Sequence, residues 1–182
     1  LDGGAGSDAM AGGPGDDVFV VDDGLDVVTE RPGEGSDEVR SSVTLSTPAN
    51  VERVRLTGTA NLSAYGTTGN DDLGGNAGAN LLVGYAGADR LAGGAGNDTY
   101  SVTDGGDTIV ELANEGVDTL QATFSTTLAT NVENLQLVTS AAVDGTGNAL
   151  DNVLTGGAGV NTLTSLAGND TLDGGAGADR LA

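Results

Sequence analysis

The sequence has no cysteine, no histidine, no lysine and no tryptophan. Without cysteine, no disulfide can stabilise the fold, and without histidine the chain lacks the commonest general base and metal ligand. The absence of lysine and cysteine also removes common catalytic bases and nucleophiles, which argues against an enzyme. Because only 3% of the residues are aromatic, we expect apolar burial to come from leucine, valine and isoleucine rather than from a conventional globular core.

Positive charge is scarce, since 27 acidic residues outnumber six arginines and give a net charge of −21. Twenty of the acids are aspartate, a short side chain that favours turns. This charge opposes compaction, so a tight fold needs a counter-ion, and nucleic acid and anionic membranes are poor partners. No apolar run approaches the ~20 residues that span a bilayer, so we expect no membrane insertion, and no N-terminal export signal is visible.

Glycine is abundant instead, and most of it lies in six-residue loops of the form G-G-x-G-x-D. Residues 93–98 are a perfect copy, and so are residues 3–8, 12–17 and 174–179. Each loop is followed by one residue, one apolar residue and one more, so the pattern repeats every nine residues. Such nonapeptides are typical of calcium-binding parallel β-helices. The apolar positions are Leu73, Leu82, Leu91, Tyr100, Leu154, Leu163, Leu172 and Leu181.

The nonapeptides form three blocks separated by two connectors. The blocks are residues 1–20, 66–101 and 147–182, and the connectors are residues 21–65 and 102–146. Placing position i on position i+81 overlays the chain on itself without a gap, so that Gly15 falls on Gly96 and Asn50 on Asn131. The chain therefore holds a little over two copies of one module, which contains a block and a connector. Because the chain opens and closes inside repeats, we expect it to be a segment of a longer protein.

The connectors contain short runs of β-branched and apolar residues separated by glycine, aspartate and asparagine. These runs predict strands, and we expect each connector to continue the solenoid with longer coils; a separate small β module is the alternative. A module is nine nonapeptides long, which is four and a half coils of two nonapeptides each. Connectors that kept coils of two nonapeptides would therefore make successive modules swap faces, whereas longer coils would avoid the swap.

Two nine-residue units form one coil, so positions i and i+18 are expected to stack. Calcium takes six to eight oxygen ligands, which two stacked loops can supply through carboxylates and through the carbonyl groups that glycine frees. Asp71, Asp89 and Asp107 recur at this spacing, and we expect these pairs to be the strongest sites. Loops with asparagine in place of aspartate should bind more weakly, and degraded loops such as residues 147–152 and 165–170 can be positions that only pack.

The full set of predicted ligands follows from the loop pattern. The side chains are Asp8, Asp17, Asp26, Asp71, Asn80, Asp89, Asp98, Asp107, Asn152, Asn161, Asp170 and Asp179. The backbone carbonyls are those of Gly3, Gly12, Gly66, Gly75, Ala77, Gly84, Ala86, Gly93, Ala95, Gly156, Ala158, Gly174 and Ala176.

A second group of acids lies in the connectors. Its members recur from one module to the next: Asp23, Asp26, Glu30, Glu34 and Asp37 correspond to Asp104, Asp107, Glu111, Glu115 and Asp118. An extra cation site and solvated charges at turns both explain this group. Among the arginines, Arg90 and Arg180 follow loops at equivalent positions, and we expect them to cover neighbouring carboxylates; sugar binding is the alternative.

The four perfect loops and their apolar partners resemble the RTX (repeats-in-toxin) family, whose signature is G-G-x-G-x-D-x-U-x with U a large apolar residue. The resemblance covers the three blocks by motif. It implies an all-β fold, a parallel β-roll or β-solenoid with calcium-binding turns. It also implies type I secretion from a Gram-negative bacterium, so the expected location is extracellular or at the cell surface; the C-terminal signal that guides such export is not recognisable here.

The predicted function is a calcium-binding, non-catalytic structural segment of a secreted adhesin, stalk or surface-layer protein, which folds on binding extracellular calcium. The alternative is the C-terminal secretion and folding module of an exported enzyme such as a protease, lipase or epimerase. Calcium ions are the expected partner, and other copies of the protein end to end and cell-surface polysaccharide are further candidates.

Overall fold

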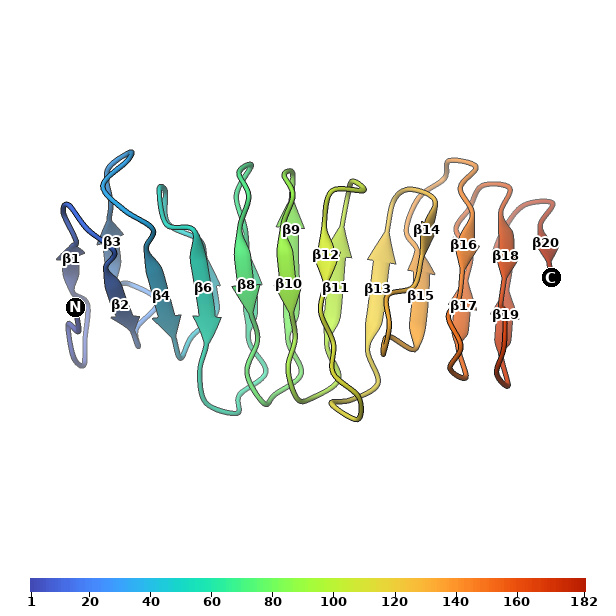
Figure 1. The fold of residues 1–182 in the computed structure, drawn as a ribbon, viewed down its shortest axis with the longest axis horizontal. Helices are drawn as coiled ribbons and strands as arrows, with labels where there is room; N and C mark the ends of the chain where they lie inside the picture. The colour runs from blue at the N-terminus through green and yellow to red at the C-terminus, as the bar shows by residue number, and fades with distance from the viewer.

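The chain folds into one long solenoid of short β-strands. A computed structural model describes all of residues 1–182 and contains 20 strands and no helix. Figure 1 shows the strands side by side along the long axis, with the two termini at opposite ends. Every strand pairing is parallel, because each coil returns the chain to the same direction. The predicted all-β, parallel solenoid is thereby confirmed, and no helix is present that could span a membrane.

The strands alternate between two faces of the solenoid. The odd-numbered strands lie on one face: β1 (Ala9–Ala11), β3 (Val27–Thr29), β5 (Leu45–Ser46), β7 (Ser63–Tyr65), β9 (Leu81–Tyr85), β11 (Thr99–Val102), β13 (Thr119–Ala122), β15 (Asn134–Leu137), β17 (Val153–Thr155) and β19 (Thr171–Asp173). The even-numbered strands lie on the other: β2 (Val18–Val21), β4 (Glu38–Ser41), β6 (Arg53–Leu56), β8 (Asp72–Gly74), β10 (Arg90–Ala92), β12 (Thr108–Ile109), β14 (Thr126–Thr127), β16 (Gly145–Thr146), β18 (Thr162–Thr164) and β20 (Arg180–Leu181).

The hydrogen-bonded ladders are interrupted once on each face. On the odd face β1 pairs with β3, and a new sheet of eight strands runs from β5 to β19. On the even face a sheet of six strands runs from β2 to β12, and a sheet of four follows from β14 to β20. The two breaks, between β3 and β5 and between β12 and β14, occupy equivalent places in the two modules, so they belong to the module and not to one copy of it.

Coil length differs between blocks and connectors. Within the blocks each coil takes two nonapeptides, so that Asp72 pairs with Arg90. In the first connector Val18 pairs with Glu38, Glu38 with Arg53, and Arg53 with Asp72. The first and third of these coils are longer than a block coil, as expected, and the second is shorter. The second connector repeats the same three lengths.

The connector nevertheless keeps the average coil of the blocks. From Val18 to Asp72 its three coils together advance the chain as far as three block coils do. Each module thus contains four and a half coils, and the next module starts on the opposite face. Strand β2 lies in the even sheet, whereas β11, its counterpart in the next module, lies in the odd sheet. Successive modules swap faces.

The core is a thin stack of apolar side chains between the two faces. Leu73, Leu82, Leu91 and Tyr100 are fully buried, as the nine-residue spacing predicts. A cluster of 17 buried residues extends from Val54 to Leu163, and a second cluster contains Met10, Phe19, Val21, Val39 and Val51. Leu181, in strand β20 at the edge of its sheet, is half exposed.

Candidate calcium sites

Many of the aspartates in the loops and connectors are hydrogen-bonded to the coil before them. Oδ1 of Asp89 accepts the backbone N–H of Asp71 at 2.8 Å, and Oδ1 of Asp107 accepts that of Asp89 at 3.1 Å. The same bond joins Asp26 to Asp8 at 2.9 Å. The structure thus stacks the aspartates that recur at i and i+18 in the sequence.

The glycine loops adopt two conformations. In six loops the second and fourth residues have a positive φ, which glycine adopts without strain. We call these the open loops, and they end at Asp8, Asp17, Asp89, Asp98, Asp170 and Asp179. In the other four no residue has a positive φ, and these closed loops end at Asp71, Asn80, Asn152 and Asn161. In both complete blocks the two closed loops come first and the two open loops follow.

The closed loops that end in asparagine satisfy their own polar groups. Oδ1 of Asn80 accepts the N–H of Asn76 at 2.7 Å, and its Nδ2 donates to the carbonyl oxygen of Leu62 at 3.2 Å. Asn152 and Asn161 form the same two bonds. The amide group therefore donates to a carbonyl that would otherwise be available to a cation.

The remaining closed loop also uses its acid internally. Oδ2 of Asp71 accepts both the N–H and the hydroxyl of Thr67, at 2.7 and 3.0 Å. Ligation of calcium by the four closed loops, through their side chains or carbonyls, stays a prediction, and these hydrogen bonds weigh against it.

Three of the open loops and four connector acids instead contain buried carboxylate oxygens that accept no hydrogen bond. These atoms are Oδ2 of Asp8, Asp37, Asp89, Asp98 and Asp107, and Oε2 of Glu30 and Glu111. Only one other buried side-chain atom lacks a partner, Nε of Arg53. A buried charge without a partner is unfavourable unless it is paired or binds a metal. Hard carboxylate and carbonyl oxygens are the ligands that calcium prefers, so the donor set fits this ion.

Burial and repulsion between carboxylates raise the pKa of four of these groups, Asp89, Asp98, Asp107 and Glu111. The pKa of Asp89 and of Asp98 is raised to about 6, mainly by burial and also by neighbouring carboxylates, against the effect of their hydrogen bonds. Burial, with added repulsion from Asp118 and Asp98, raises the pKa of Glu111 to about 8. Without a cation, Glu111 therefore favours a bound proton at neutral pH, whereas Asp89 and Asp98 stay mostly ionised there.

Two clusters of three carboxylates lie where a block meets its connector. The junction triads are Asp17, Glu30 and Asp37, and, in the next module, Asp98, Glu111 and Asp118; in each triad one oxygen from every residue lies within 4.8 Å of the others. The predicted ligands include only the first member of each triad. The third lies beyond the i+18 position, so a search at that spacing misses it. The sequence signal that does identify this third acid is its recurrence at the same position of the next module.

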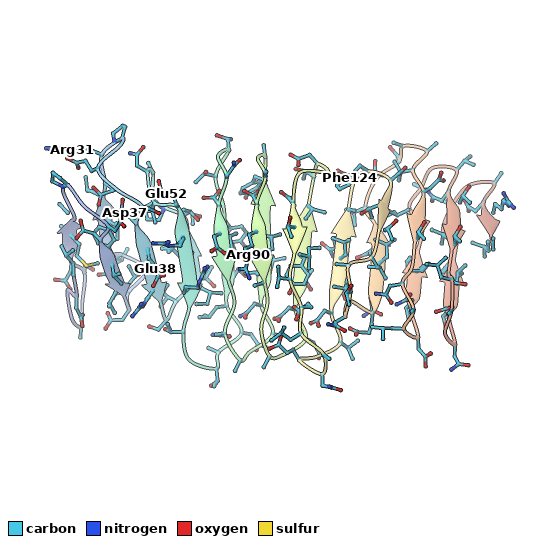
Figure 2. All side chains as sticks on the ribbon, in the orientation of Figure 1. Arg31, Asp37, Glu38, Glu52, Arg90 and Phe124 are labelled. Atoms are coloured by element: carbon cyan, nitrogen blue, oxygen red, sulfur yellow. The ribbon has the colours of Figure 1, made fainter.

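Next to each triad, the carboxylate of a further glutamate binds the backbone of the third acid. Oε2 of Glu52 accepts the N–H of Asp37 at 2.8 Å, and Figure 2 shows these two residues beside each other near the N-terminal end. Glu133 makes the same bond to Asp118 in the next module. The third acid of each triad is thus held in place through its own backbone.

Two of the arginines pair with an acid outside these sites. Arg55 and Arg90 both contact Asp72, at 2.5 and 3.1 Å. Burial alone would raise the pKa of Asp72, but the hydrogen bonds and charges of the two arginines hold it below its usual value. Arg90 therefore contacts a neighbouring carboxylate, as its position after a loop predicts.

Comparison with known families agrees with this geometry. The family model of the RTX calcium-binding nonapeptide repeat matches residues 1–28, 65–100 and 146–181, which is more than half of the chain. The chain therefore belongs to this family, and its solenoid carries calcium-binding repeats. Such repeats are typical of secreted bacterial proteins, and a fold made only of repeats favours a structural role. No curated protein matches the chain.

Proposed function

We propose that the chain is a non-catalytic structural segment of a secreted bacterial protein, of the adhesin, stalk or surface-layer kind, which folds when it binds extracellular calcium. One observation carries the proposal: seven buried carboxylate oxygens in the open loops and the connector acids next to them have no partner inside the protein. A cation is the ligand that these oxygens lack, and calcium is the cation of the family to which the repeats belong.

Calcium would link folding to location. At the low free calcium of a cytosol, a chain with a net charge of −21 repels itself and stays extended. Extracellular calcium modules have dissociation constants of ~10⁻⁴–10⁻³ M, so they fill after export. At a free calcium concentration about a hundredfold above the dissociation constant, each filled site adds about 2.7 kcal/mol to the free energy of unfolding. Several such sites would offset the repulsion and the loss of chain entropy.

The distribution of the acids supports a structural role. The junction triads recur once per module, and the stacking of Asp89 on Asp71 repeats in the next coil as Asp107 on Asp89, as repeated structural ligands do. A catalytic site would instead need a unique group of acids, bases or nucleophiles. In the parent protein we expect many further copies of the module; a catalytic domain there would favour the secretion module of an exported enzyme.

Circular dichroism tests the proposal directly. In excess chelator the spectrum should show little β-sheet, and millimolar calcium should produce the β signal with a cooperative thermal transition. Magnesium at the same concentration is the control, because it prefers about six ligands at roughly 2.0–2.1 Å and dehydrates reluctantly; it should restore much less structure. A full β signal in chelator would contradict the proposal.

A further inference from the structure

We propose that the two junction triads are divalent-cation sites of a separate kind, each built from the last loop aspartate of a block and from a glutamate and an aspartate of the connector that follows. They differ from a site between two nonapeptide loops, because two of the three acids come from the connector. The inference rests on the ability of the chain to bind calcium but not on its proposed role in export.

The connector takes the place of a second loop above Asp98. Oδ1 of Asp118 accepts the N–H of Asp98 at 2.8 Å, so it makes the same stacking bond as the loop aspartates although the coil between them is longer than two nonapeptides. Glu111, which follows β12, contributes a third carboxylate. Its backbone is fixed, because Nδ2 of Asn131 donates to its carbonyl oxygen at 3.0 Å. The longer coil therefore brings one more acid to the site than a nonapeptide pair has.

The triads are buried and incomplete. Asp98 and Asp118 are 1% exposed and Glu111 is 6% exposed. Oδ2 of Asp98 and Oε2 of Glu111 accept no hydrogen bond, and none of the three residues forms an ion pair. The equivalent Glu30 and Asp37 also have unpartnered buried oxygens. A divalent cation can satisfy three converging carboxylates at once, and oxygens within 4.8 Å of one another suit ligand distances of roughly 2.3–2.6 Å.

A glycine leaves room for each triad. A Cβ added to Gly93 would overlap Oδ2 of Asp98 and the hydroxyl of Tyr100. A Cβ added to Gly12 would overlap Oε2 of Glu30 and would lie 2.6 Å from Oδ2 of Asp17. The first glycine of the loop is therefore required at both junctions for the carboxylates to converge.

The two triads differ in one neighbour. The hydroxyl of Tyr100 donates to Oε1 of Glu111 and accepts the N–H of Gly93 at 2.7 Å. Phe19 occupies the same position in the first module, where Oε1 of Glu30 accepts the N–H of Arg31 at 3.2 Å. In both triads Oε2 remains free for the cation. A phenol thus lies next to one triad and not the other.

This difference gives a site-specific test with terbium(III), which binds oxygen ligands as calcium does and emits when a nearby tyrosine absorbs light. The chain has three tyrosines and no tryptophan, so in a variant with Tyr65→Phe and Tyr85→Phe only Tyr100 can sensitise emission. We expect tyrosine-sensitised emission that calcium displaces. Absence of this emission, in protein that binds terbium, would overturn the inference.

Two further changes in that background locate the ion. Glu111→Gln should weaken terbium binding at least tenfold, because even changes to groups behind a metal ligand cost about 10–100-fold in affinity. Glu38→Gln is the control, since it removes the same charge from an acid that pairs with Arg40 and Arg53; its emission should be unchanged. Equal emission from the two variants would overturn the inference.

A further variant, in which terbium emission should increase, keeps the inference testable if Glu111→Gln does not fold. Phe19→Tyr copies the natural arrangement of Tyr100 and removes no ligand, so emission should rise as the first triad is sensitised too; unchanged emission counts against the inference. The outcomes separate the two proposals. Calcium-dependent folding with no emission from Tyr100 would refute the junction sites alone, whereas emission without calcium-dependent folding would refute the proposed function alone.

Discussion

Asp107 stacks directly on Asp89: its Oδ1 accepts the N–H of Asp89 at 3.1 Å, and the Oδ2 atoms of both residues are buried without a partner. Asn80, one nonapeptide before Asp89, has no such free oxygen, because its amide both accepts and donates within its own surroundings. The interior of the turns thus differs along a block: internal amides satisfy the asparagine loops at its start, and buried carboxylate oxygens without a partner lie at its end.

Replacement of Asp107 by asparagine should remove one calcium ion from the protein. The affinity of this turn for calcium should fall at least tenfold, since loss of a ligand exceeds the roughly 10–100-fold effect of an outer-shell change. The calcium-free fold should gain stability, because repulsion with Asp89 is lost. Calcium titration followed by circular dichroism, with ions counted by native mass spectrometry, measures both effects. The control is Asp144→Asn, at an exposed acid whose Oδ1 accepts only the N–H of Thr162; an equal loss there would contradict the assignment.

Acid should stabilise the calcium-free fold. Burial raises the pKa of Glu111 from 4.5 to about 8, and that of Asp89 and Asp98 from 3.8 to about 6. A carboxyl group whose pKa is higher in the folded state stabilises that state when protonated, and the contribution is lost as pH rises through the folded-state pKa. In calcium-free buffer the β-sheet signal in circular dichroism should therefore decrease as the pH rises from about 4.5 to 8. Glu111→Gln should flatten the upper part of this profile, and a β-sheet signal that increases across the window would refute the prediction.

Gly116 should not tolerate a side chain. A Cβ at this position would overlap the backbone carbonyl oxygen of Gly96 in the coil below, so Gly116→Ala forces the two coils apart and should destabilise the folded state by about 1–3 kcal/mol. Gly105→Ala is the matched control, because its Cβ would meet only Cε2 of Phe124 at 3.7 Å, an ordinary contact. Urea denaturation in millimolar calcium measures the free energy of unfolding of both variants. Equal values would show that the coils at Gly116 lie farther apart than in this structure.

The apolar stack should be most sensitive at its centre. Leu82 is fully buried, and Leu82→Ala should lower the free energy of unfolding by about 2–5 kcal/mol. Leu181 is 50% exposed, so the same change there should stay within about 0.5 kcal/mol. Thermal denaturation in calcium distinguishes them, and comparable losses at both positions would be inconsistent with the stack.

The nine-residue pattern predicts the stack well, since Leu73, Leu82 and Leu91 lie at its centre and are fully buried. It does not predict which loops are open. Tyr85 and Leu166 adopt the positive φ of an open loop although neither is glycine. The glycines of the loop motif alone therefore do not determine this conformation.

The connectors show the same limit of local patterns. Runs of β-branched residues predict strands such as β4 and β6, but not that the coil between them is shorter than the others. Pairing depends on how the turns between strands fill space. The loop spacing therefore leaves Asp37 out of the site with Asp17, because the coil that joins them is longer than two nonapeptides.

Each module contains four and a half coils, and the extra half coil decides on which side of a long chain of modules each junction triad lies. Neighbouring junction triads lie on opposite flanks of the filament, so a rigid partner docked on one flank meets only every second triad. Nine coils separate two triads on the same flank, which is roughly 43 Å at ~4.8 Å per coil. A filament of many modules would thus look alike from both flanks, and neither would be reserved for attachment.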